Sequence, residues 1–321
     1  MKLLALSGRR RLFVRYVFRV RLQRLSLDFD YAPFSLLPKT LVAAPAMILD
    51  GEVLRRQFAA RFAHGERGAA FTVEVVDSIP STNARLLSNA RQSASHFLIA
   101  RQQTAGVGRR GGVWQSPPSG NLYLSYCFHT SLSLSVVALL PLAFGVEIAR
   151  EIEFVLGISI QLKWPNDLYL DGKKCGGLLL ETKALEDDVM ALVVGVGVNV
   201  ASHPSQTLLG RPVTSLQSVL DEPISSERVA IAVMAAIKVV SELKDLEISA
   251  LLTNHWSTRD LLLEQEVTVS QAAGAQVTGI ARGIAADGGL QVDCGGRIET
   301  FYAGEVSLGH VGPADVVSNG G

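Results

Sequence analysis

Residues 163 to 181 read Lys-Trp-Pro-Asn-Asp-Leu-Tyr-Leu-Asp-Gly-Lys-Lys-Cys-Gly-Gly-Leu-Leu-Leu-Glu, and they place two charged clusters in an otherwise apolar frame. Pro165 interrupts a strand-like run, so the first cluster, residues 163–167, is predicted to lie where a strand ends. The second cluster, the lysine pair 173–174, follows the Asp-Gly pair 171–172 between two leucine-rich runs, which predicts a hairpin turn. Loops that are held by rigid strands often carry function. We therefore expect this stretch to bind an anion.

Length and composition indicate an ordinary globular protein. A chain of 321 residues is long enough for about two domains. Its hydrophobic content of 48% and charged content of 19% give no reason to expect disorder. The formal net charge of zero argues against a nucleic-acid partner that binds through bulk electrostatics. Charged residues or prolines interrupt each apolar run before the roughly 18 residues of a membrane span, so no membrane partner is expected.

The cysteines argue against a metal or disulfide framework. Cys127, Cys175 and Cys294 are odd in number, widely spaced and form no C-x-x-C pair. Neither a zinc site nor a set of disulfides is therefore supported, and the expected location is the reducing cytoplasm.

The first 46 residues differ in composition from the rest. They hold nine basic residues and two acidic ones, so their net charge is 9 − 2 = +7. An Arg-rich, acid-poor start resembles a targeting peptide. The alternative is an over-extended start, with Met47 as the true first residue. Neither interpretation supplies a helix-turn-helix, so a DNA-binding repressor domain is not expected.

From residue 47 onward helical and strand patterns are mixed, which predicts an α/β or α+β layer for roughly residues 70–262. The Ser81 hydroxyl is placed to cap the helix that follows it. The expected helices cover 48–67, 83–92, 135–156 with Pro141 near its first turn, and 226–246; the expected strands cover 71–76, 97–100, 121–128 and 190–199.

Residues 263–310 change to short strands separated by glycine turns. The expected strands are 266–269, 277–280, 289–292 and 298–301. This spacing predicts a small β-barrel as a second domain, followed by a flexible tail at 311–321.

A glycine-rich loop at residues 103–114 contains a literal G-x-G-x-x-G, whose usual interpretation is a dinucleotide site. The prolines that follow cannot open the helix that such a site needs, and the next acid, Glu147, is too distant to hold a ribose. Arg109 and Arg110 favour a mobile loop that wraps one or two anions. A solvent-exposed basic turn is the alternative.

Together these motifs resemble the biotin protein ligases, within the wider biotin/lipoate ligase fold, from about residue 71 to residue 308. The resemblance implies that residues 47–262 form an α+β catalytic domain with a mixed β-sheet and flanking helices, and that the second domain is an SH3-like β-barrel. The matching segments are Ser81-Thr82-Asn83, the loop Gln103 to Trp114, Lys163 to Asp167 (K-W-P-N-D), Lys174 to Leu178, Gly195-x-Gly197-x-Asn199, and Gly304-Glu305-Val306-Ser307-Leu308.

The resemblance implies a ligase that uses ATP and Mg²⁺ in two steps. Biotin and MgATP would give biotinyl-5′-adenylate, and the biotinyl group would then pass to one lysine of a biotin carboxyl carrier domain of acetyl-CoA carboxylase or a related carboxylase. A carboxylate that attacks an α-phosphate brings anions together, so positive charge must neutralise both. A homodimer is left open.

The resemblance also assigns roles to individual residues. Lys174 and Arg109 are the expected catalytic residues, and a closed arginine loop would keep water from the adenylate. Asp167 and Asn199 are further expected to help hold Mg²⁺ and the phosphates. The expected biotin-binding residues are Ser81, Thr82, Asn83, Gln103, Gly106, Val107, Gly108, Arg109, Lys174 and Gly177; those expected to bind ATP or the adenylate are Arg109, Arg110, Trp114, Asp167 and Asn199.

The chain departs from the family loop at two positions. Val107 stands where the family usually has arginine, and Gly112 stands where it usually has a basic residue. Loss of the first arginine predicts weaker retention of the adenylate. Three alternatives remain: a lipoate or octanoate ligase or transferase on the same fold, a non-catalytic biotin sensor, and a nicotinamide-dependent oxidoreductase.

Overall fold

The computed structural model describes residues 49–62, 71–118, 120–186, 188–206, 211–271 and 275–309. The predictions for residues 1–46 and for the tail 311–321 lie outside these ranges. No helix within them is long and apolar enough to cross a membrane.

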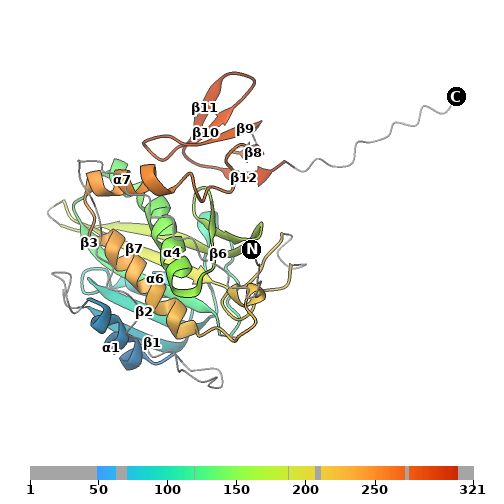
Figure 1. Cartoon of the computed structure of the whole chain (residues 1–321). Coiled ribbons are helices and arrows are strands. Elements are labelled where there is room, and N and C mark those ends of the chain that lie inside the picture. Colours follow the sequence, from blue (N-terminus) through green and yellow to red (C-terminus); the bar gives the residue numbers. More distant parts are fainter. Residues whose placement is uncertain are drawn as a thin grey trace, which may run out of the picture. The chain divides into compact units, whose positions relative to one another are not determined.

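The larger domain is built on a seven-stranded mixed sheet (Figure 1). The strand order is β1-β2-β3-β7-β6-β5-β4. Only β1 and β2 run parallel, and every other neighbouring pair is antiparallel. The strands are β1 (Thr72–Ile79), β2 (His96–Gln103), β3 (Leu122–Thr130), β4 (Gln161–Lys163), β5 (Asp167–Leu170), β6 (Lys173–Ala184) and β7 (Met190–Val198).

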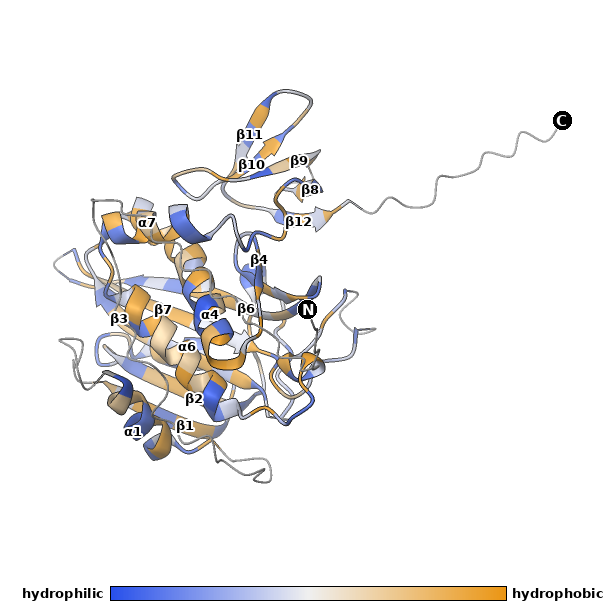
Figure 2. Ribbon diagram, in the orientation of Figure 1, coloured by the Kyte–Doolittle hydropathy of each residue, from blue (hydrophilic) through white to orange (hydrophobic). Residues whose placement is uncertain are grey.

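Helices cover the sheet through their apolar residues. The helices are α1 (Gly51–Phe62), α2 (Thr82–Ser88), α3 (Leu134–Val137), α4 (Leu140–Leu156), α6 (Ser226–Ser241) and α7 (Asp245–His255). Hydrophobic residues run along α4 and α6 (Figure 2), which pack against each other and contact β6 and β3 respectively. Removing such apolar area from water is the main stabilising term of the fold.

Three predicted helices are wrong in extent. The helix expected over 83–92 ends at Ser88, and turns follow it. The helix expected over 135–156 is two helices, because Pro141 lies in the first turn of α4, where its missing N–H is tolerated but continuation from α3 is not. The helix expected over 226–246 ends at Ser241, and a new helix, α7, begins at Asp245. Its start is stabilised by the backbone N–H of Lys244, which donates to the Glu247 carboxylate at 2.9 Å.

The smaller domain is a five-stranded antiparallel sheet with the order β11-β10-β9-β8-β12. Its strands are β8 (Glu266–Ser270), β9 (Gln276–Ile284), β10 (Leu290–Asp293), β11 (Ile298–Phe301) and β12 (Glu305–Leu308). The first four confirm the predicted strands, and β12 completes the sheet by pairing with β8. The predicted α+β fold with a small C-terminal β domain is confirmed.

The charged stretch 163–181 folds as predicted. β4 ends at Lys163, and β5 and β6 form a hairpin joined by two residues. Asp171 and Gly172 have φ values of 49° and 70°, which are the positive values that a type I′ turn needs at both central positions. The turn leaves Lys173 exposed and Lys174 buried.

Candidate functional site

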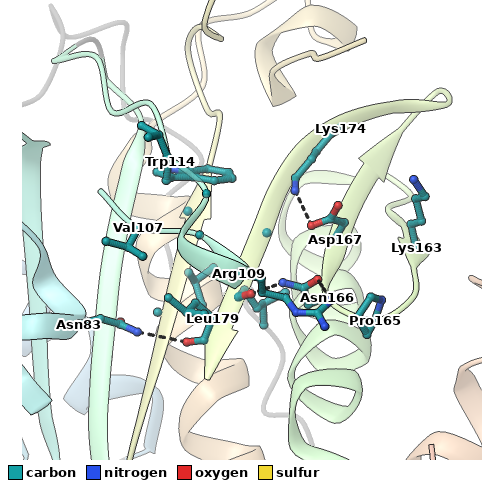
Figure 3. A pocket seen from close by; sticks show the side chains of 18 of the residues that line it. Asn83, Val107, Arg109, Trp114, Lys163, Pro165, Asn166, Asp167, Lys174 and Leu179 are labelled. Atoms are coloured by element: carbon teal, nitrogen blue, oxygen red, sulfur yellow. Dashed lines mark hydrogen bonds and ion pairs between the residues drawn. The ribbon is translucent and has the colours of Figure 1, made fainter. Parts of the chain in front are cut away.

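A cavity of about 320 Å³ lies where the glycine loop, the segment after β4 and strands β6 and β7 meet (Figure 3). Residues 304–306 of the smaller domain complete its wall. Of the residues predicted from the sequence, those that line it are Ser81, Thr82, Asn83, Gln103, Val107, Gly108, Arg109, Trp114, Asp167, Lys174 and Gly177. Gly106, Arg110 and Asn199 are not among the lining residues.

Lys174 is the buried cation among those that line the cavity. Its side chain is buried, and its Nζ forms an ion pair with the Asp167 carboxylate (Figure 3). Nζ also lies 5.7 Å from the centroid of the Trp114 ring. Burial lowers the pKa of Lys174, and the Asp167 charge opposes this shift. The structure thus holds an ammonium group inside the cavity, with one carboxylate as its counter-ion.

Three further cations line the same cavity: Lys163, Arg109 and Arg211. Lys163 lies 5.5 Å above the centroid of the Tyr169 ring, and burial lowers the pKa of Lys163. Arg109 donates to Asn166 Oδ1 at 3.4 Å, and its pKa is lowered by burial and then by Arg110. Together these groups form a concave surface that favours a polyanion.

The glycine loop is a closed hairpin. The Trp114 N–H donates to the Gly106 carbonyl at 2.9 Å, and the Gly108 N–H donates to the Gly112 carbonyl at 2.6 Å. Val107 and Val113 pair across this hairpin, and Val107 is 49% exposed although it lines the cavity. The loop brings Arg109 to the cavity and leaves Arg110 exposed. This is not the strand-to-helix turn of a dinucleotide site.

The other end of the cavity is lined by uncharged polar groups. Ser81 caps α2 as predicted, since its hydroxyl accepts from the Ala84 N–H at 3.3 Å. The Thr82 N–H donates to Gln103 Oε1 at 2.9 Å, and Ser125 Oγ contacts Thr82 Oγ1 at 2.7 Å and Asn83 Oδ1 at 2.5 Å. Such a set of amides and hydroxyls suits a neutral, hydrogen-bonding ring.

Two glycines of β7 make room for two site residues. A Cβ at Gly197 would lie 2.5 Å from the Trp114 indole, and a Cβ at Gly195 would overlap the Asn83 amide. Residues two apart on a strand share one face, so both side chains rest on the same face of β7. The glycines therefore position Asn83 and Trp114.

Comparisons with known proteins agree with this geometry. Residues 75–199 match the Biotin/lipoate A/B protein ligase family, and residues 262–309 match the Biotin protein ligase C terminal domain. The chain is 31% identical over 241 residues to the bifunctional ligase/repressor BirA of Escherichia coli (strain K12), covering 74% of each chain. The chain belongs to the biotin protein ligase family.

Other members of the family support the assignment. The biotin--[acetyl-CoA-carboxylase] ligase of Mycobacterium tuberculosis is 30% identical over 241 residues, which cover 73% of this chain and 88% of the relative. The solved biotin protein ligase from Aquifex aeolicus in complex with biotin and ATP superimposes with a TM-score of 0.62 at 27% identity, over 73% of this chain and 97% of that one.

In this biotin protein ligase, Asn199 does not lie at the cavity where the sequence predicted a phosphate or metal contact. Its side chain is buried and donates to the Thr214 carbonyl at 3.0 Å, and its N–H donates to the Cys175 carbonyl at 2.8 Å. Asn199 instead ties β7 to the chain that follows Arg211. The described ranges hold no group of three or more His, Cys, Asp or Glu residues that could bind a metal ion.

The sequence missed four functional candidates of the ligase: Ser125, Asn166, Arg211 and Glu305. Asn166 and Glu305 belong to the matched motifs, so a role for them could have been inferred. Ser125 lies inside a buried strand and Arg211 in an irregular segment, and neither carries a local signal.

Proposed function

We propose that this biotin protein ligase activates biotin with ATP and transfers the biotinyl group to a lysine of a biotin carboxyl carrier domain. In the first step an oxygen of the biotin carboxylate attacks the α-phosphorus, a P–O bond forms, and the bond to pyrophosphate breaks. In the second step the carrier amine attacks the acyl carbon, a C–N bond forms, and AMP leaves with the C–O electrons. The observation that carries the proposal is a buried lysine, Lys174, in a cavity with cations and a set of neutral polar groups.

Lys174 is proposed to contact the biotin carboxylate and the α-phosphate. Fixed positive charge in a desolvated site stabilises the charge that develops on the phosphoryl oxygens. The Asp167 carboxylate balances this charge. We propose that a bound anion displaces Asp167 in part. Arg109 supplies a second charge-assisted contact from the glycine loop.

The remaining predicted residues divide between the two ligands. We propose that Ser81, Thr82, Asn83, Gln103, Gly108 and Gly177 surround biotin, and that Trp114 lies against the adenylate. The indole Nε1 of Trp114 is buried and has no hydrogen-bond partner in the described part of the chain, so it is free to donate to a ligand. Magnesium is proposed to arrive bound to the ATP phosphates, and Asp167 would help to hold it once a bound anion displaces this carboxylate from Lys174.

The acceptor and the location are also proposed. A carrier domain of acetyl-CoA carboxylase is favoured because relatives that are 29–30% identical carry that acceptor in their names. A cytoplasmic location is consistent with three unpaired cysteines, two of them buried. A homodimer remains a proposal, which sedimentation of the purified protein tests.

The deciding experiment incubates the purified chain with labelled biotin, ATP and an acceptor carrier domain. We expect label on one carrier lysine and expect none when lipoate or octanoate replaces biotin. Transfer of lipoate or octanoate instead would show the alternative acyl substrate. Biotin binding without ATP–pyrophosphate exchange would show a non-catalytic sensor.

A further inference from the structure

Behind the polar end of the cavity, hydrogen-bonded side chains lead away from the ligand space to Glu181. Thr82, Asn83 and Ser125 are 3%, 6% and 0% exposed. Glu181 lies on β6 and is not among the residues that line the cavity. Because each side chain has a known number of donors and acceptors, the direction of every bond in this chain can be worked out.

The Asn83 amide has one permitted orientation. Its Nδ2 lies 2.8 Å from Oε2 of Glu181 and 3.3 Å from the Leu179 carbonyl oxygen (Figure 3 shows the second contact). A carboxylate and a backbone carbonyl only accept, so the NH₂ group must face them. The amide oxygen therefore faces Ser125, whose Oγ is 2.5 Å away.

The same rule sets the direction of the next two bonds. Asn83 Oδ1 has no proton to give, so Ser125 must donate its single hydroxyl proton to it. Ser125 Oγ is also 2.7 Å from Thr82 Oγ1, and it can only accept there, so the Thr82 hydroxyl must donate. Thr82 Oγ1 also lies 3.1 Å from Gln103 Oε1, an acceptor that the Thr82 backbone N–H already contacts at 2.9 Å. Both neighbours of the Thr82 hydroxyl, Ser125 and Gln103, therefore accept its proton. Thr82, which lines the cavity, is left with an acceptor lone pair and no proton to offer a ligand.

We infer that Glu181 is a positioning residue for biotin recognition, because it orients Asn83 and Ser125 so that the Thr82 hydroxyl oxygen accepts a hydrogen bond from a ring N–H. The inference rests on the proposed function. The biotin head is a cyclic urea with two N–H donors, which such an acceptor binds. A ring of the same shape with oxygen in place of each N–H would place an acceptor against the Thr82 hydroxyl oxygen, which is also an acceptor. Such a ring should therefore bind more weakly than biotin.

The test measures binding of two probes by calorimetry: biotin and its cyclic carbonate analogue, in which oxygen replaces both ring N–H groups. The variants are Glu181→Met, which removes the acceptor, and Glu181→Gln, which keeps an acceptor oxygen. Glu186→Met is the matched control, because Glu186 is an exposed glutamate that pairs with Arg91 outside the chain of bonds.

We expect the wild-type protein to prefer biotin over the carbonate by at least about tenfold, the size of effect that one unsatisfied buried polar group produces. Glu181→Met should reduce this preference by about fivefold or more, chiefly by weakening biotin binding. Glu181→Gln and Glu186→Met should keep it, and the KM for ATP should not change. An unchanged preference in Glu181→Met would overturn the inference.

A charge swap provides a second, independent test. Asn83→Asp places two carboxylates across the 2.8 Å contact and should weaken biotin binding about tenfold or more. Adding Glu181→Gln should restore binding, because the glutamine NH₂ donates to the new carboxylate, whose other oxygen still accepts from Ser125. A double variant no better than the single one contradicts the inference. Failure of the wild-type protein to bind biotin would overturn the proposed function itself, which distinguishes the two failures.

Discussion

At the scale of single residues, Lys174 is a charged group held where burial disfavours charge. Desolvation lowers its pKa, and the Asp167 carboxylate and the Trp114 ring face partly compensate. Burying a charged group costs free energy, so the position of Lys174 indicates a site that binds an anion. Lys173, its neighbour, is exposed at the start of β6.

We predict that Lys174→Ala abolishes adenylate formation. Removing one fixed charge or donor from a transition state typically costs about 10²–10³ in rate. The measurement is ATP–pyrophosphate exchange driven by biotin, with circular dichroism to verify the fold. Lys173→Ala is the matched control and should exchange at the wild-type rate. Wild-type exchange by Lys174→Ala would remove Lys174 from the mechanism.

Val107 leads to a second prediction at this scale. It lines the cavity at 49% exposure, at the position where the family resemblance predicts an arginine. Val107→Arg should slow the loss of biotinyl-adenylate and tighten biotin binding, because a charge-assisted hydrogen bond contributes roughly 1.5–3 kcal/mol.

The half-life of the enzyme-bound adenylate and the dissociation constant for biotin measure this effect. Val219→Arg is the control, because Val219 is 43% exposed and is not among the residues that line the cavity. If Val107→Arg changed neither quantity, the missing arginine would have no bearing on retention.

At the scale of elements, strand β7 leaves space on one face for two side chains of the site. Its glycines at 195 and 197 carry no side chain on the face where Asn83 and Trp114 lie. Taken from the sequence alone, this pair is equally consistent with close backbone packing. Only the sheet, which brings residues 83 and 114 onto this strand, shows what the glycines make room for.

We predict that Gly197→Ala weakens ATP binding at least about tenfold, because the new methyl group would displace the Trp114 indole. Calorimetric titration with a non-hydrolysable ATP analogue in the presence of biotin gives the affinity. The double variant Gly197→Ala/Trp114→Ala should bind no worse than Trp114→Ala alone, since the overlap is then absent. Additive losses would argue that Gly197 acts in some other way.

At the scale of the whole molecule, the smaller sheet is joined to the cavity at two places. Residues 304–306 line the cavity directly. The indole N–H of Trp164, which is buried, donates to the Gly288 carbonyl in the β9–β10 turn at 3.0 Å. Trp164 immediately precedes Pro165 to Asp167, which line the cavity, so the bond connects the smaller domain to the catalytic segment.

We predict that Trp164→Phe lowers the free energy of unfolding by about 0.5–1.5 kcal/mol, the usual net value of one hydrogen bond, and also slows adenylate formation. Urea denaturation and pyrophosphate exchange measure the two effects. Trp256→Phe is the control, because it loses a similar bond of 2.9 Å to Asp260, and neither residue is among those that line the cavity. It should lose stability and keep its exchange rate; equal losses of activity in both variants would contradict the prediction.

The sequence by itself determined the parts of this protein that depend on local chemistry. The Asp171-Gly172 turn, the Ser81 cap and the four alternating strands of the smaller domain follow from φ preferences, capping and side-chain period, which act over a few residues. The same locality explains the errors, because a run of apolar residues does not show that Pro141 or the Lys244–Glu247 contact begins a new helix.

Only the tertiary structure decided which of these parts meet. Glu181 reaches Asn83 across 98 positions, and Ser125 reaches Thr82 across 43, because β6, β3 and the start of α2 are brought together by the sheet. The cavity likewise gathers Arg211, from a segment with no local signal of a role, and Glu305, from a motif of the other domain, and it leaves out Asn199, whose motif suggested a role. The physical reason is that hydrogen bonds and charges act through space over a few ångströms, whereas sequence patterns report only on neighbours along the chain.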